Sequence, residues 1–344
     1  MNKKILAFII SLASLWPVIL PAQEQQEDEY CDPRVNGLER PTGISLSYER
    51  IMDYRIYSRS NVDYLEDGDG AVNYNRRIKF KFKVPVVNKD RFKMTYGFHY
   101  SHEEFRFEDP ENLDYSLYKS LEDKSLKSLG SNFYFLFPQK NKTFFAVQVN
   151  LNLNGDYYRG DVGLAKFLKV SAGPMWGKKP NDNLMYGFGF AYSYTFGDPS
   201  LSPLFAYYHT FSPKWGIEAL LPLEAKVRFN MNEGSVWYLG AETRGASYNV
   251  RLNDPALVDK STLELRHSEI RLFFKLDQEI HDFLWVSLQA GYRYNLNFNL
   301  AESNHNRKPT NFFKREYIVE STLEDAFYFN LSLNIKPPKK WYKD

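Results

Sequence analysis

Charged side chains of both signs recur at every second position along several segments of this chain. Lys79, Lys81 and Lys83, for example, alternate with Phe80 and Phe82. Residues two apart leave a β-strand on the same face, so these charges would share one polar surface. Opposite charges on such a surface would form ion pairs, and unpaired ones would select ions. The residues predicted to form this polar surface are Glu49, Asp53, Arg55, Lys79, Lys81, Lys83, Lys93, Glu218, Glu224, Lys226, Arg228, Glu242, Arg244, Glu269, Arg271, Lys275 and Arg293.

Other residue types that perform chemistry are present without a recognisable pattern. His99 and His102 are three apart, and residues three apart on a strand point to opposite faces, so they do not predict a metal site. The Asp67-Gly-Asp-Gly70 stretch is followed by Ala71 and Val72, so it lacks the further oxygen ligands of a calcium loop. No Ser–His–carboxylate signature is recognisable. The sequence therefore predicts no metal ligand, no cofactor and no catalytic residue.

The strictest alternation runs through residues 284–300. Its even positions, from Leu284 to Leu300, are all apolar or aromatic, whereas its odd positions carry Arg293 and several amides. A helix would scatter these residues around its surface. An ordinary strand has about 5–6 residues, and a tilted membrane-crossing strand about 9–11. This length predicts a strand with one face toward lipid and the other toward a polar lumen.

Similar segments recur from residue 44 to residue 335, and about fourteen (12–14) are recognisable. Their number and alternation predict an all-β fold, an antiparallel up-and-down transmembrane β-barrel. The charges named above would then face its lumen. In a narrow barrel they would pair across the lumen and fill it; otherwise they would line a channel.

The connections between the segments sort into two sets, as an outer-membrane barrel requires. Every second connection is short, as at residues 88–90, 139–141 and 212–214, and all the long ones belong to the alternate set. A soluble β-sandwich has no reason to sort its loops in this way. The long connections, expected on the extracellular side, are residues 58–70, 108–124, 156–161, 251–261 and 301–321.

The start of the chain predicts export. Lys3 and Lys4 precede a short apolar run that ends near Ala22, which is typical of a cleaved signal peptide. Cys31 is the only cysteine, so an intramolecular disulfide is excluded and an unpaired thiol is expected. The predicted organisation is a signal peptide (1–22), a flexible leader (23–41), an outer-membrane β-barrel (42–337) and a periplasmic tail (338–344).

Composition agrees with an outer-membrane location. Mean hydropathy is −0.50, which excludes a bundle of membrane helices, while aromatic residues make up 17% of the chain. Barrel strands end in aromatic girdles, although a soluble sandwich rich in Tyr and Phe shares this composition. Without Lys3 and Lys4 the chain has 42 basic and 42 acidic residues, so nucleic acid is not an expected partner. The expected partners are membrane lipid and the barrel-assembly machinery.

Several motifs at strand ends and turns carry a family resemblance. They are Ile44-Ser-Leu-Ser-Tyr48, Tyr194-Thr-Phe-Gly-Asp-Pro-Ser-Leu-Ser-Pro-Leu204, Lys214-Trp-Gly-Ile217, Leu221-Pro222, Trp237-Tyr-Leu-Gly-Ala-Glu242 and Ala290-Gly-Tyr-Arg-Tyr294. On these motifs, residues 43–335 resemble a family of predicted outer-membrane β-barrel proteins from Bacteroidota, catalogued only as a domain of unknown function. The resemblance implies the fold and carries no catalytic residues.

The expected function is that of a non-enzymatic outer-membrane β-barrel, porin-like or structural, with a charged lumen. One alternative is an outer-membrane hydrolase acting on lipid or peptide, since catalytic groups from separate strands leave no local signature. Another is a surface-binding protein that uses the long loops at residues 108–124 and 301–321, both of which are rich in charged and aromatic residues.

Overall fold

The computed structural model describes residues 30–157, 164–252, 263–302 and 316–341. The predicted signal peptide and parts of three predicted long connections lie outside these ranges. Among the described residues, no helix has the length and apolar character needed to cross a membrane.

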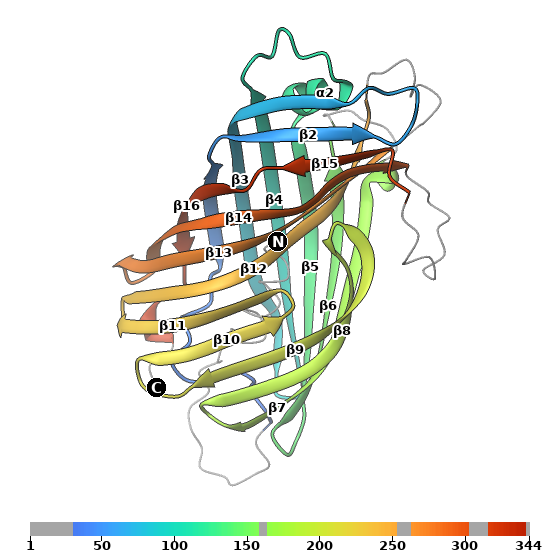
Figure 1. The fold of residues 1–344 in the computed structure, drawn as a ribbon. Coiled ribbons are helices and arrows are strands. Elements are labelled where there is room, and N and C mark those ends of the chain that lie inside the picture. The colour runs from blue at the N-terminus through green and yellow to red at the C-terminus, as the bar shows by residue number, and fades with distance from the viewer. Residues whose placement is uncertain (1–29, 158–163, 253–262, 303–315, 342–344) are drawn as a thin grey trace.

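The strands form one closed antiparallel sheet (Figure 1). β1 (Ile44–Ile51) and β2 (Tyr54–Ser60) both pair with β3, so they are halves of one strand. β15 (Val319–Leu323) and β16 (Ala326–Ile335) likewise both pair with β14, and β16 closes the barrel against β1. The barrel therefore has fourteen strands, which confirms the predicted fold. The others are β3 (Gly68–Lys89), β4 (Phe92–Phe107), β5 (Leu126–Pro138), β6 (Thr143–Gly155), β7 (Leu168–Asn181), β8 (Leu184–Phe196), β9 (Asp198–Thr210), β10 (Trp215–Leu221), β11 (Glu224–Asn232), β12 (Ser235–Val250), β13 (Leu263–His281) and β14 (Leu284–Glu302).

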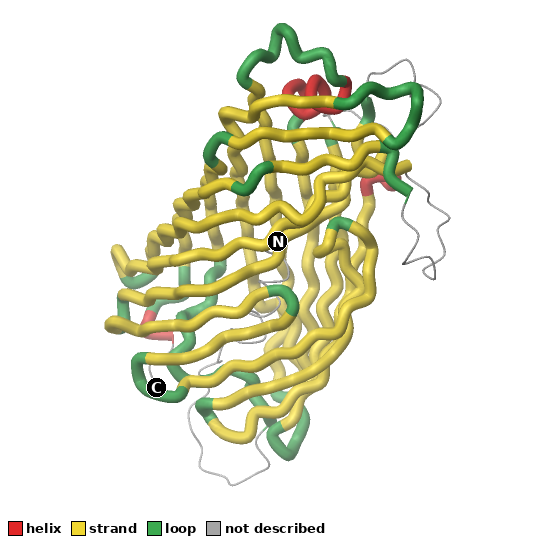
Figure 2. Tube along the Cα trace, in the orientation of Figure 1, coloured by secondary structure: helices red, strands yellow, loops and turns green. Residues whose placement is uncertain are grey.

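Loops gather at the two ends of the barrel (Figure 2). The connection between β4 and β5 contains a helix, α2 (Ser116–Lys124), which the sequence analysis did not predict. α2 buries Leu117, Tyr118 and Leu121, which share one helical face. The Tyr118 hydroxyl donates to the carbonyl oxygens of Ile56 (3.1 Å) and Gly68 (3.2 Å), so α2 covers the end of the barrel where β2 turns into β3.

The half of the barrel next to the short turns has the side-chain alternation of a membrane barrel. Apolar and aromatic side chains such as Phe188, Leu239, Leu288 and Phe329 are exposed on its outer face. The side chains between them point inward and are mostly polar. A β-sheet satisfies all of its backbone hydrogen bonds within lipid only when it closes into a barrel. The chain is an outer-membrane protein, and this half, the membrane half, spans the bilayer.

In the other half of the barrel the alternation is inverted. The strands are interrupted at residues 52–53 and 324–325, and Asn73 and Leu296 are extra residues opposite their partner strands. One extra residue moves every later side chain to the opposite face of a strand. Beyond these four positions, apolar side chains point inward and polar ones outward.

The inverted half has the construction of a soluble β-barrel, and we call it the head. Tyr54, Ile56, Val72 and Phe298 are among the side chains of its continuous apolar core, which α2 closes from above. The head consists of residues 54–72, 105–126, 245–250, 263–268, 297–302 and 316–323.

The inversion corrects the expected orientation of four residues. Unbroken alternation predicts Asp53 and Arg55 in the lumen and Phe298 and Leu300 against lipid. The structure has Asp53 and Arg55 exposed on the outer surface, while Phe298 and Leu300 are fully buried in the head. The interruption at residues 52–53, which includes Asp53, and the extra residue Leu296 reverse the face on which these side chains lie.

A short hairpin lets one part of the wall fold into the barrel. β10 and β11 end well below the tips of their neighbours (Figure 1), and the pairing of β11 with β12 stops at Glu224 and Glu242. Beyond that point β12 approaches β6 instead, where Asn249 pairs with Gly155 and Asn154 donates to the Ser247 carbonyl at 3.2 Å.

This infolding produces a polar contact surface inside the barrel, which we call the seam. The outer faces of β12 and β13 meet the inner faces of β6 to β9 there. Gly245 is required in it, because a Cβ at this position would clash with the Thr195 carbonyl oxygen. The side chains of the seam are Asn154, Lys169, Ser193, Thr195, Asp198, Ser247, Asn249, Glu264 and Arg266.

We expect Leu288→Arg to block membrane assembly, because Leu288 is 51% exposed on the outer face of the membrane half. A cation facing mid-bilayer costs about 2–4 kcal/mol. The measurement is the fraction of protein that migrates as a folded, heat-modifiable band. Leu288→Met, which keeps the volume and polarity, should assemble normally; equal assembly of both variants would place this face outside the bilayer.

Candidate functional site

Residues 30–43, which we call the floor, lie across the end of the lumen next to the short turns. The sequence predicts a flexible leader here, and the described part follows the rim of the barrel from turn to turn. The Cys31 amide donates to the Gln139 carbonyl (3.2 Å), and the Asn36 amide donates to the Asp182 carbonyl (2.7 Å). The Thr210 hydroxyl donates to the Asn36 carbonyl at 2.6 Å.

Arg40 anchors the far end of the floor. Its guanidinium lies 2.9 Å from the Asp282 carboxylate and donates to the Pro337 carbonyl at 2.6 Å. It also lies over the ring of Trp285, at 5.6 Å from the centroid. Beside it, Lys336 forms a 2.8 Å ion pair with Glu39. These contacts join the leader to the β13–β14 hairpin and to the residues that follow the last strand.

Cys31, at the start of the floor, is buried in an apolar cluster. The cluster includes Leu136, Phe144, Met185 and Leu220, which point into the lumen from β5, β6, β8 and β10. Burial raises the pKa of the Cys31 thiol to about 11. This side of the lumen therefore contains a packed apolar filling.

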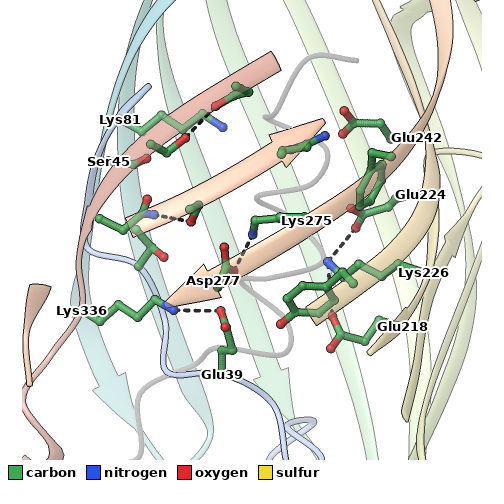
Figure 3. Close-up of a pocket in the computed structure, with 18 of the residues that line it drawn as sticks. Glu39, Ser45, Lys81, Glu218, Glu224, Lys226, Glu242, Lys275, Asp277 and Lys336 are labelled. Carbon is green, nitrogen blue, oxygen red and sulfur yellow. Dashed lines mark hydrogen bonds and ion pairs between the residues drawn. The ribbon is translucent and has the colours of Figure 1, made fainter. Parts of the chain in front are cut away.

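The opposite side of the lumen contains a chamber of about 170 Å³ directly above the floor (Figure 3). Charged residues from neighbouring strands line it. Glu218, Glu224, Lys226 and Glu242 lie on one side, and Lys81 lies across from them. Further lining residues are Glu39, Arg40, Lys83, Arg244, Lys275, Asp277 and Lys336.

Each acidic group in the chamber wall has a basic partner. Lys226 lies 3.3 Å from Glu218 and 3.1 Å from Glu224, and Lys275 lies 2.6 Å from Asp277. Glu224 and Glu242 stand directly opposite each other on β11 and β12, an arrangement that is destabilising for like charges. Lys226 and Arg244 offset this repulsion, so the carboxylates are tolerated side by side.

A layer of buried ion pairs lies on the head side of the chamber. Glu49 is its centre, with its carboxylate 2.8 Å from Arg244, 2.9 Å from Arg271, 3.3 Å from Arg77 and 3.6 Å from Lys79. The complete ion-pair layer is Glu49, Arg77, Lys79, Glu103, Glu242, Arg244, Glu269 and Arg271.

Four acids and four bases balance the layer, and their side chains are at most 12% exposed. Arg77 links both sides, 2.8 Å from Glu103 and 3.0 Å from Glu269. Buried ions need such pairing because their desolvation is costly. The layer and the apolar core of the head fill much of the lumen above the chamber.

One serine and one histidine of the lumen lie close together. His99 Nε2 is 3.4 Å from Ser128 Oγ, and Asn132 Nδ2 is 3.2 Å from His99 Nδ1. A nucleophilic serine must give its proton to the histidine. Ser128 instead donates to Asn154 at 2.7 Å, which is the shorter contact. The arrangement is a hydrogen-bonded ladder across β4, β5 and β6.

A metal site is likewise not formed by the described residues. They contain no cluster of three or more histidine, cysteine or carboxylate side chains placed to hold a metal ion.

The family model of a domain of unknown function, DUF6268, matches residues 162–336, which is half of the chain. The chain belongs to this family. The matched region holds the seam strands β7 to β9, β12 and β13, one side of the chamber and half of the ion-pair layer. A search of curated proteins found no similar sequence.

Solved structures similar to the chain include an outer membrane channel and a transporter. The COG4313 outer membrane channel from Pseudomonas putida F1 is 12% identical, with 91% of this chain and 99% of that chain covered and a TM-score of 0.40. A Pseudomonas aeruginosa FadL homologue is 9% identical (90% and 95% covered, TM-score 0.44). The Pseudomonas putida toluene transporter TodX is 11% identical (95% and 97% covered, TM-score 0.37). These values are too low to transfer any property.

The residues expected on the polar surface separate into four groups. Glu49, Lys79, Glu242, Arg244, Glu269 and Arg271 lie in the ion-pair layer, and Lys81, Lys83, Glu218, Glu224, Lys226 and Lys275 line the chamber. Lys93 pairs with Asp32 of the floor (3.3 Å), Arg228 with Glu218 (3.2 Å), and Arg293 lies buried over the Tyr54 ring (4.2 Å). Asp53 and Arg55 are on the outer surface, as described above.

Sequence reasoning missed several of the site's charges. Arg77 and Glu103 extend the odd-numbered alternation of their strands, which was a usable signal. Glu39, Arg40 and Lys336 lie outside the strands, where no periodicity marks a side chain as inward. Their positions follow from how the leader folds back into the barrel.

We expect Glu49→Gln to destabilise the barrel strongly, because it removes the shared partner of four buried cations. Breaking a buried ion pair from one side costs about 3–5 kcal/mol. The free energy of unfolding in lipid–detergent micelles measures this. Glu104→Gln is the control, since its pair with Arg76 lies on the outer surface, and such a pair is worth about 0–1 kcal/mol. Equal losses would mean that the layer carries no special stability.

The Cys31 thiol should react slowly with thiol reagents at pH 8 while the floor is in place. Its raised pKa of about 11 keeps it protonated below that pH, so the thiolate fraction is roughly 100-fold below that of an exposed cysteine. Arg40→Ala should accelerate labelling by releasing the floor, whereas Lys89→Ala at the exposed end of β3 should not. Equal rates in folded and denatured protein would show that Cys31 is accessible.

Proposed function

We propose that this protein is a gated, porin-like channel for small polar solutes and has no enzymatic activity. The observation that supports this most is the charged chamber, which lies between two closures, the floor on one side and the ion-pair layer with the head on the other. A purely structural barrel gains nothing from a space of about 170 Å³ among charges. A charged lumen with closures is what a gated conduit requires.

The floor is the simpler of the two closures to open. It is held by side-chain and rim contacts of one short segment, of which Arg40 to Asp282 and Lys336 to Glu39 are the charged ones at its far end. No strand of the barrel has to move for residues 30–43 to leave. The periplasmic side of the chamber therefore opens by displacement of a single segment.

The seam is the proposed route from the chamber toward the cell exterior. The head itself has an apolar core, through which a hydrated solute would pass only at a high desolvation cost. The seam is polar along its length and is held by ion pairs. Lys169 lies 2.6 Å from Glu264, and Arg266 pairs with both Asp198 and Glu264. Separation of β12 and β13 from β7 to β9 would expose a polar surface.

A plugged structural barrel is the second candidate. The charge balance of the buried layer favours it, since paired and fully buried charges specify one packed arrangement. Surface binding through the head is a weaker alternative that rests on α2 and the exposed loop before it. The hydrolase alternative is not supported by the Ser128–His99 contact, for the reasons given above.

Arg266→Ala should convert a silent barrel into a conducting one. The substitution removes the cation that Asp198 and Glu264 share, so the two carboxylates repel each other across the seam. In planar bilayers we expect the wild type to stay mostly closed and the variant to open at least tenfold more often.

Arg106→Ala is the matched control, because its pair with Glu122 (2.8 Å) lies on the outside of the head. It should behave like the wild type. If neither the Arg266 variant nor Arg40→Ala conducts while both remain heat-modifiable, the plugged structural barrel is the better description.

A further inference from the structure

We propose that one side of the barrel, at the end with the short turns, binds the head groups of anionic glycerophospholipids. The proposal concerns the outer rim of the barrel rather than its lumen, so it does not depend on whether the barrel conducts. Three observations support it: the charge of four turns, the aromatic side chains beside them and the backbone conformation of Lys142.

The four short turns between β3 and β10, with the strand ends that enter them, form what we call the basic rim. It consists of residues 88–91, 139–142, 177–183 and 212–214. Its basic residues are Lys89, Arg91, Lys140, Lys142, Lys178, Lys179 and Lys214, and its acidic residues are Asp90 and Asp182. Seven positive charges against two negative ones leave a net charge of +5.

The acidic groups near the basic rim do not neutralise it. Lys179 lies 3.0 Å from Asp182, and Asp32 of the floor pairs with Lys93, which points into the lumen. Lys142, Lys178 and Lys214 form no ion pair with any described residue. An anion from outside the chain therefore meets uncompensated positive charge there.

The opposite side of the same end of the barrel is balanced. It comprises residues 38–43, 232–234, 279–283 and 336–341, which contain four acidic and four basic residues. Several of these already pair with one another, as Arg40 does with Asp282 at 2.9 Å and Lys339 with Glu279 at 3.1 Å. The positive charge is thus confined to the side formed by β3 to β10.

Aromatic side chains on the outer face place the basic rim at the depth of lipid head groups. Phe137, Trp176 and Trp215 are exposed at the ends of β5, β7 and β10, directly beside the turns. Such side chains mark the boundary between the hydrocarbon and the head groups. The turns are too short to extend far beyond that boundary, so lipid phosphate is the anion within reach. In outer-membrane barrels short turns lie at the periplasmic surface, so the lipids are those of the periplasmic leaflet.

Lys142 and Lys178 form the centre of the basic rim. Lys178 follows Trp176 by two positions on β7, so both side chains leave the strand on the outer face. Thr143 pairs with Lys178, which brings the turn that contains Lys142 alongside. The Lys142 ammonium group donates to the Pro180 carbonyl at 2.9 Å and keeps two further donors. Two ammonium groups beside an exposed indole suit a lipid phosphate.

The backbone of Lys142 indicates that its side chain is retained for a reason. Asn141 and Lys142 have φ angles of 60° and 59°, so both lie in the left-handed region. Gly adopts this conformation without steric cost and Asn tolerates it, whereas a lysine is strained there. Strain of this kind is kept where the side chain has a function. A phosphate ligand supplies that function.

The test is fluorescence quenching of the full mature protein in bilayers that contain brominated lipids at low ionic strength. One variant keeps Trp176 as its only tryptophan, and a second keeps Trp237, which is exposed on β12 at the balanced side; Phe replaces the others. Brominated phosphatidylglycerol should bind next to Trp176 about tenfold more tightly than brominated phosphatidylcholine, since each nearby lysine contributes roughly fivefold. Both lipids should quench Trp237 equally.

The double substitution Lys142→Gly and Lys178→Gln, made in the Trp176 protein, removes the central ammonium groups. Its preference for phosphatidylglycerol should fall to about twofold or less, and the barrel should stay folded because glycine relieves the strained turn. Arg59→Gln with Lys119→Gln is the matched control, since it removes the same charge from exposed positions on the head. The control should keep the full preference.

Three results would overturn the proposal: equal quenching of Trp176 by both lipids, the same preference at Trp237, or an unchanged preference in the Lys142–Lys178 variant. A chain without residues 23–29, which include four acidic residues, tests another occupant of the basic rim. If Trp176 prefers phosphatidylglycerol only in that shortened chain, the leader and not lipid neutralises the rim.

Discussion

The face on which each side chain lies is the constraint that governs this barrel. Within lipid, every strand must turn its apolar side chains outward, and side chains change face at each residue. Outside lipid the requirement reverses, because the apolar side chains must then be covered. Four irregularities, at residues 52–53, 73, 296 and 324–325, make this reversal in β1–β2, β3, β14 and β15–β16. In β4 and β13 the same positions point inward throughout, and apolar residues replace polar ones at these positions in the head. One continuous sheet thereby forms both a membrane barrel and a soluble head.

The inversion also determines what the lumen contains. Apolar side chains fill the head, so inward charges are concentrated in the membrane half, where they are shielded from water. Glu49 and its four cations show the outcome, since a buried carboxylate is stable only with partners that offset its desolvation. The charges cross-link β1, β3, β12 and β13. They hold the wall together at the level where the inward-facing side chains change from polar to apolar.

The chamber exists because the apolar cluster around Cys31 and the ion-pair layer do not fill the whole lumen. The apolar cluster around Cys31 fills one side of the lumen, and the ion-pair layer closes the level above. Between them, residues 38–43 form the base of a space lined by long charged side chains. The short β10–β11 hairpin contributes as well, because it frees β12 to fold inward and form the seam. The floor, the seam and the chamber thus arise from the same local features.

Local alternation allowed most of the fold to be predicted from sequence. The lipid-facing position of Leu288 and the inward position of Lys81 follow from the residues beside them, because strand geometry is local. The orientation of Phe298 and Arg55 did not follow, since a bulge depends on the hydrogen bonds of the partner strand. The pairing of Glu49 with Arg271, and of Glu39 with Lys336, joins segments from opposite ends of the barrel sequence. Such contacts exist only once the barrel has closed, so the chamber was decided by tertiary structure.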